Sequence, residues 1–168
     1  MQTPSTPPPR TEQHTLTALL RVGEVAVAFR EHVATGDLPG AWPLIDPTLR
    51  LAWARDWAQD HGARLRRLCP KRLAERLSCL DGPAHPLWKH FAADRLQQLR
   101  QVEAAGWSHS ATGLPPLGPD TEVLYARPDH PEDWGAPADP RTVPMVMRWN
   151  GAAWKVLAYG SLSHPEPQ

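Results

Sequence analysis

The chain has 168 residues, with 18 basic and 18 acidic side chains and a formal net charge of zero. This balance argues against a general polyanion binder, which would carry a basic excess. No run of 18 apolar residues occurs, and the first ten residues lack the basic-then-apolar order of a signal peptide. We therefore expect one cytoplasmic domain with no membrane partner, flanked by a proline-rich extended or disordered tail over residues 1–13 and a short tail over 161–168. The domain itself is expected over residues 14–160.

The cysteines and histidines give no sign of a metal centre. Cys69 and Cys79 lie ten residues apart without a CxxC pattern, which is typical of ordinary thiols in a reducing compartment. None of the eight histidines forms an HxxxH pattern or joins a cysteine at ligand spacing. The sequence therefore predicts neither a metal nor a cofactor.

The sequence from residue 11 to about residue 105 predicts helices. Apolar residues recur at steps of three and four from Thr11 to Thr35, Gly36 ends this segment, and Asp37 caps a short helical turn. Asp46-Pro47 is a second start signal, a capping carboxylate followed by proline at the first helical position. The predicted segments are 11–35, a turn or two after 37, 47–62, 63–80 with a break or restart at Pro70, and about 85–105.

Five leucines are expected to form the apolar side of the fourth segment, with both cysteines inside it. They are Leu65, Leu68, Leu73, Leu77 and Leu80.

After Gly106 the pattern changes to strands, weakly over 107–112 and more clearly over 121–127, 142–149 and 152–159. Asn150-Gly151 favours a two-residue type I′ turn between the last two strands. That turn pairs Trp149 with Ala152, Met147 with Trp154, Met145 with Val156 and Val143 with Ala158, so that one face is entirely apolar. We expect the helices to cover this face.

The opposite face of the predicted hairpin carries Val146, Leu157 and Tyr159. Their apolar character predicts self-association through the outer face of the sheet, as a homodimer. The fold class that follows from the whole pattern is α+β, with N-terminal helices packed on a curved antiparallel sheet.

Three stretches resemble the nuclear transport factor 2-like (NTF2-like) superfamily. Residues 28–42 (AFREHVATGDLPGAW) are similar to its opening helix and Gly-Asp turn, residues 45–50 (IDPTLR) to the segment that opens its next helix, and residues 143–156 to its closing hairpin. The resemblance covers about residues 15–160. It implies a cone in which a curved sheet wraps helices around a pocket. Members include isomerases, dehydratases, hydrolases, ligand binders and non-catalytic dimers, so the fold alone does not select an activity.

Eight tryptophans are the most unusual compositional feature. One interpretation is an aromatic pocket for a small apolar ligand, with Trp53, Trp57, Trp107 and Trp149 as the candidates. The alternative is core packing, which the helical spacing of Trp53 and Trp57 favours.

Acid–base catalysis in such a pocket needs a carboxylate or a histidine, and the candidates are Asp56, His109 and Tyr125. A carboxylate at the edge of the apolar face, between Trp53 and Trp57, would have a raised pKa. The alternative for Asp56 is a surface ion pair with a neighbouring arginine. No catalytic arrangement of the superfamily's enzymes matches this sequence residue by residue.

A basic run over residues 64–76 offers a third site. It consists of Arg64, Arg66, Arg67, Lys71, Arg72 and Arg76, interrupted by the single acid Glu75. An anionic partner is one interpretation, and a solvated helix face opposite leucines is the other. Nucleic acid is not expected, because no aromatic residues alternate with the basic ones.

The sequence thus favours a non-catalytic interaction or small-ligand-binding domain. The alternative is a small-molecule enzyme of the isomerase, dehydratase or hydrolase type, working in a pocket between helices and sheet. A more remote alternative is a binder of an anionic partner through Arg64–Arg76.

Overall fold

The computed structural model describes residues 12–62, 65, 68–102, 107–111, 120–128 and 143–160. Five α-helices precede four strands in this part of the chain: α1 (Glu12–Thr35), α2 (Leu38–Ala41), α3 (Pro47–Asp60), α4 (Pro70–Ser78), α5 (Trp88–Val102), β1 (Trp107–Ala111), β2 (Thr121–Pro128), β3 (Val143–Trp149) and β4 (Trp154–Tyr159). Short 3₁₀ turns at Trp42–Leu44 and Gly82–Ala84 connect helices. The predicted α+β class, helices first, is confirmed. The two predicted tails lie almost entirely outside the described residues.

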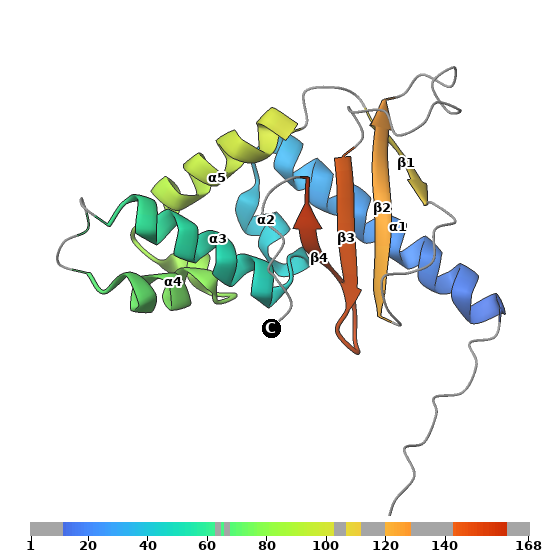
Figure 1. The fold of residues 1–168 in the computed structure, drawn as a ribbon, viewed down its shortest axis with the longest axis horizontal. Coiled ribbons are helices and arrows are strands. Elements are labelled where there is room, and N and C mark those ends of the chain that lie inside the picture. The colour runs from blue at the N-terminus through green and yellow to red at the C-terminus, as the bar shows by residue number, and fades with distance from the viewer. Residues whose placement is uncertain are drawn as a thin grey trace, which may run out of the picture.

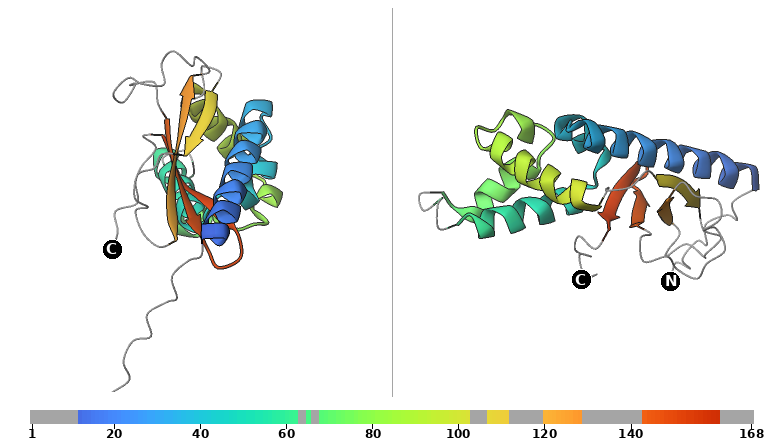
Figure 2. Two further views of the ribbon diagram at one scale, coloured as in Figure 1. Left: turned by 90° about the vertical axis from the view of Figure 1, so that its right-hand side faces the viewer. Right: turned by 90° about the horizontal axis from the view of Figure 1, so that it is seen from above.

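The four strands form one antiparallel sheet in the order β1-β2-β3-β4. Helix α1 runs across one face of this sheet (Figures 1 and 2). Helices α3, α4 and α5 gather beside the β4 end of the sheet rather than over its face (Figure 1). The molecule therefore has a sheet-and-helix layer at one end and a helical cluster at the other.

The helix starts follow the capping signals. Gly36 has a φ of 80°, a left-handed conformation that ends α1 at low steric cost. The carboxylate of Asp37 accepts a hydrogen bond from the amide of Gly40 (2.9 Å), and that of Asp46 accepts one from the amide of Thr48 (2.8 Å). Both predicted N-caps are thus confirmed.

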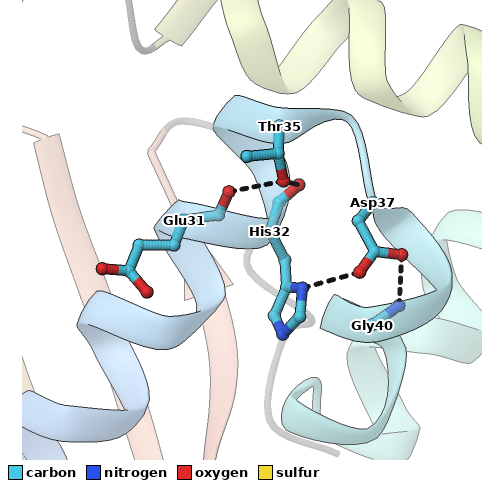
Figure 3. A network of polar contacts seen from close by, with 5 residues as sticks. All are labelled: Glu31, His32, Thr35, Asp37 and Gly40. Carbon is cyan, nitrogen blue, oxygen red and sulfur yellow. Dashed lines mark hydrogen bonds and ion pairs between the residues drawn. The ribbon is translucent and has the colours of Figure 1, made fainter.

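The joint between α1 and α2 also carries a side-chain contact. Nδ1 of His32 lies 2.8 Å from Oδ2 of Asp37 (Figure 3). The Asp37 carboxylate therefore contacts both the last turn of α1, through His32, and the first turn of α2, through the Gly40 amide. The hydroxyl of Thr35 donates back to the carbonyl of Glu31 at 2.9 Å. These contacts fix the angle at which the chain leaves α1.

The core is centred on Trp42, which is fully buried. Its ring lies 4.8 Å from that of Trp88, 5.6 Å from Phe91 and 6.5 Å from Trp53. Its indole N–H donates to the carbonyl of Cys79 at 2.8 Å. Burying several aromatic rings supplies a large apolar area, so most of the tryptophan excess is explained by packing.

The segment over 63–80 differs in part from the prediction. A helix starts at Pro70, as the predicted restart expects, and ends at Ser78. Of the five predicted inward leucines, Leu73 and Leu77 are buried on its inner side, together with Ala74. Leu68 and Leu80 are 45% and 65% exposed, because they lie beyond the helix ends and leave the amphipathic repeat. Cys69 and Cys79 flank α4 as exposed free thiols.

The register of the last hairpin also differs from the prediction. Trp149 pairs with Trp154, Arg148 with Lys155 and Met147 with Val156, so the loop holds four residues instead of two. Oδ1 of Asn150 accepts hydrogen bonds from the amides of Ala152 (3.0 Å) and Ala153 (2.9 Å). The asparagine side chain thus organises the wider loop as an Asx turn.

A register shift between Val146 and Met147 changes which residues face the helices. Beyond it, Met145 pairs with Tyr159, and Val146 pairs with Ala158. Tyr159 is 1% exposed and its ring meets Phe29 of α1 edge-on at 5.4 Å, while Val146 is 7% exposed. The prediction that Tyr159 faces outward is therefore wrong, because the extra residue in β4, Leu157, exchanges the two faces of that strand beyond it. Val146 stays on the side of β3 opposite Met145 and Met147, as predicted, but it is buried.

Candidate functional site

Two adjoining depressions lie on the surface between α3 and α5. The first, of about 360 Å³, is mostly apolar and is lined by Trp57, His61, Leu65, Leu87, His90, Ala93 and Asp94. The second, of about 470 Å³, is mostly polar and is lined by Trp57, Asp60, His61, Asp94, Arg95, Gln97, Gln98 and Gln101. We call the two together the α3–α5 groove. The groove has an apolar half and a polar half, and three residues belong to both.

The three shared residues, Trp57, His61 and Asp94, contact one another. The indole N–H of Trp57 donates to Oδ2 of Asp94 at 2.8 Å. The imidazole of His61 stacks on the indole of Trp57, with ring centroids 4.6 Å apart and planes inclined by 24°. Nε2 of His61 lies 3.3 Å from the same carboxylate oxygen. This trio lines both halves of the groove and forms the divide between them.

Helix geometry places the trio. Trp57 lies near the end of α3 and His61 is the residue that caps it, so a spacing of four sets the two rings one above the other. Nδ1 of His61 lies 3.0 Å from the carbonyl oxygen of Trp57. Asp94 comes from the facing side of α5, and its bond to Trp57 ties the two helices together.

The ring nitrogens of His61 both face acceptors. A carbonyl oxygen only accepts, so Nδ1 donates its hydrogen to Trp57, and Nε2 faces the carboxylate of Asp94. A histidine that acts as a general base needs one nitrogen directed at its substrate. The arrangement of His61 therefore suits holding the wall of a binding groove better than transferring protons.

Arg95 forms the floor of the polar half. It is 5% exposed, donates to Oε1 of Gln98 (2.7 Å) and to the carbonyl of Trp53 (3.0 Å), and lies over the Trp53 ring at 5.1 Å. Burial lowers its pKa, and the nearby carboxylates of α3 and α5 act in the opposite direction. Arginine stays charged at any pH a protein experiences, so Arg95 is a fixed cation beneath an acidic rim.

The predicted catalytic residues Asp56, His109 and Tyr125 lie on α3, β1 and β2. Asp56 is exposed on α3, and its negative charge raises the pKa of Arg95. It is therefore a surface carboxylate and is not buried between Trp53 and Trp57. His109 lies in β1 opposite Ala126, and Tyr125 lies in β2 opposite Ser110. The side chains of His109 and Tyr125 lie outside the described part of the structure.

The predicted ligand-binding tryptophans occupy different places. Trp57 lines both halves of the groove, whereas Trp53 is fully buried in the core. Trp149 is partly buried and packs on Trp154 across the hairpin at 5.8 Å. The side chain of Trp107 lies outside the described residues. One of the four candidates, Trp57, therefore lines the groove.

The basic run is only partly described. Lys71, Arg72 and Arg76 are exposed on α4, as the solvated-face interpretation expects. Arg64, Arg66 and Arg67 lie outside the described residues.

Sequence reasoning missed His61, Asp94 and Arg95. The pair Trp57 and His61 carried a usable signal, because aromatic rings four residues apart stack at a helix end. Asp94 and Arg95 gave no local signal, since their partners lie about 40 residues earlier in the chain.

Within the described ranges, no three or more His, Cys, Asp and Glu side chains come close enough to hold a metal ion. Among the described helices, none combines the length and apolar composition needed to cross a bilayer.

Comparison of the chain with protein-family models, with curated proteins and with solved structures found no match in any of the three.

Proposed function

We propose that the chain is a non-catalytic, NTF2-like domain that binds a small amphipathic ligand in the α3–α5 groove. The observation that carries the proposal is the two-part lining of this groove. Leu65, Leu87 and Ala93 offer an apolar wall on one side of the divide, and Gln97, Gln98 and Gln101 offer amides on the other. A ligand with an apolar body and a hydrogen-bonding end fits this division.

The NTF2-like part of the proposal is supported by the chain order of helices followed by an antiparallel sheet, with α1 across one sheet face (Figure 2). The groove lies elsewhere than the pocket expected from the resemblance. It lies between two helices beside the sheet, and not between helices and sheet.

The non-catalytic part is supported by the contacts of His61. Both of its nitrogens are directed at groups of the protein, and Asp94 already accepts from Trp57. His61 therefore has no ring nitrogen left to exchange a proton with a ligand.

The test is a titration with N-acetylphenylalaninamide, whose ring and two amides match the two halves of the groove, followed by ¹H–¹⁵N NMR. We expect millimolar binding that moves the indole N–H resonance of Trp57, assigned with Trp57→Phe, and the backbone amides of Leu87 and Gln98. Leu87→Glu should abolish these shifts, because it places a charge in the apolar half.

Leu80→Glu is the matched control, since Leu80 is 65% exposed and does not line the groove. It should leave the binding constant within a factor of two. Shifts that are absent, or that are equally reduced by both variants, would show that the groove is not a ligand site.

The cytoplasmic location belongs to this proposal, and the two exposed free thiols fit a reducing compartment. Self-association through the outer sheet face stays a prediction, in which Leu157 is the one residue of the three that is more than slightly exposed. Sedimentation equilibrium of the wild type and of Leu157→Glu measures it.

A further inference from the structure

Arg50 is a buried cation on α3, outside the α3–α5 groove. Its side chain is 7% exposed, and both Nε and Nη1 are enclosed without a hydrogen-bond acceptor in the described structure. Burying a charged donor without an acceptor is strongly unfavourable, so a partner for this group is expected.

The nearest carboxylate does not fill this need. Asp46 precedes Arg50 by one helical turn, but its oxygens accept from Nε and Nη2 of Arg148 and from the amide of Thr48. Asp46 therefore influences Arg50 through space without a hydrogen bond. Burial lowers the pKa of Arg50, and the charge of Asp46 offsets part of that effect.

Arg50 borders an aromatic cluster that contains further buried donors. Its guanidinium lies over the Trp42 ring at 5.8 Å, and the N–H of Trp42 is already committed to the carbonyl of Cys79. The indole N–H groups of Trp53 and Trp88, in the same aromatic cluster, are also buried without an acceptor. Among the residues that the structure describes, every unsatisfied side-chain atom in this cluster is thus a donor.

We propose that Arg50 holds a small inorganic anion of the size of chloride. An anion accepts from donors, needs no acceptor of its own and neutralises the buried charge. A water molecule would accept from Arg50 but would have to direct its own two hydrogens at acceptors, and it would add no negative charge to the partial compensation that Asp46 provides. The proposed anion site lies where α3 meets the end of α4 and exists only in the folded protein. Binding of the anion therefore stabilises the folded state.

The test compares urea unfolding in sodium chloride and in sodium gluconate at constant ionic strength, followed by tryptophan fluorescence. For a dissociation constant of about 10 mM, raising chloride from about 1 to about 100 mM increases the folding equilibrium constant about tenfold. Arg50→Met should remove this increase. Arg55→Met, an exposed arginine of the same helix, should keep it.

Crystals grown in sodium bromide give a second readout that does not depend on the stability of the variant. An anomalous bromide peak within hydrogen-bonding distance of the Arg50 guanidinium is expected. A chloride response that is equal in the wild type and in Arg50→Met would overturn the proposal, and so would crystals without bromide at Arg50.

Discussion

Arg148 on β3 holds the carboxylate of Asp46, 102 positions earlier in the chain, through two hydrogen bonds: Nε to Oδ2 at 2.9 Å and Nη2 to Oδ1 at 2.5 Å. The Asp46 side chain is 1% exposed and that of Arg148 is 39% exposed. The same carboxylate caps α3 through Thr48, and the amide of Asp46 donates to Val156 of β4 at 2.8 Å. One aspartate therefore starts a helix and joins it to two strands of the sheet.

We predict that Arg148→Met lowers the free energy of unfolding by about 2–4 kcal/mol, because it leaves a buried carboxylate without its cation. Urea unfolding measures the change. Arg72→Met, at an exposed arginine on α4, should change stability by less than about 0.5 kcal/mol. In a double-mutant cycle, Arg148→Met and Asp46→Asn together should cost less than the sum of the two single changes. Additive costs would mean that the two side chains do not stabilise each other.

The joint between α1 and α2 leaves no room for a side chain at Gly40. A Cβ there would overlap the Asp37 carboxylate and the His32 ring. We predict that Gly40→Ala destabilises the protein by about 1–3 kcal/mol, the usual cost of overpacking. Gly23→Ala is the matched control in α1, where a Cβ meets no atom within 4 Å. It should stabilise by about 0.5–1 kcal/mol, since alanine favours helix. Equal effects of the two changes would contradict the packing seen in Figure 3.

Asp37 should make stability sensitive to acid. The hydrogen bond from the Gly40 amide, together with His32, holds the pKa of Asp37 below its usual value of 3.8. As the pH falls, the unfolded chain therefore takes up a proton at Asp37 before the folded protein does. The stabilisation is present above about pH 4 and is lost as the pH falls through the lower, folded-state pKa.

We therefore predict that Asp37→Asn, which keeps a capping side chain but does not titrate, flattens the decline of stability below about pH 4. The measurement is the urea midpoint between pH 2.5 and 6. Asp81→Asn is the control, because the Asp81 side chain makes no capping hydrogen bond. An acid limb of unchanged steepness in Asp37→Asn would show that another group dominates it.

The helix starts could be predicted because they depend on local contacts. Asp37 and Asp46 each bond to an amide two or three residues ahead, and this requires nothing from the rest of the chain. The antiparallel strands and the burial of Met145, Met147, Trp154 and Val156 could also be predicted, because alternation alone assigns residues to faces.

The strand register could not be predicted from alternation. The observed pairing of Trp149 with Trp154 differs from the expected one by two residues, and a shift of two leaves every side chain on its original face. The bulge after Val146 had no local signal either, and it is the bulge that turns Tyr159 toward Phe29.

The groove was missed for a related reason. Asp94 meets Trp57 through the packing of α5 on α3, which the local pattern of neither helix encodes.

The hairpin loop offers the sharpest test of the corrected register. With four loop residues, Oδ1 of Asn150 accepts from the amides of Ala152 and Ala153. We predict that Asn150→Ala costs about 1–2 kcal/mol, because both amides lose their acceptor. Gly151→Ala adds strain at a φ of 93°, so Asn150→Ala combined with Gly151→Ala should cost more than Asn150→Ala alone. The expected two-residue turn would instead make Ala152 the direct partner of Trp149. Cross-strand NMR contacts between Trp149 and Trp154 distinguish the two registers, and contacts from Trp149 to Ala152 in their place would restore the shorter turn.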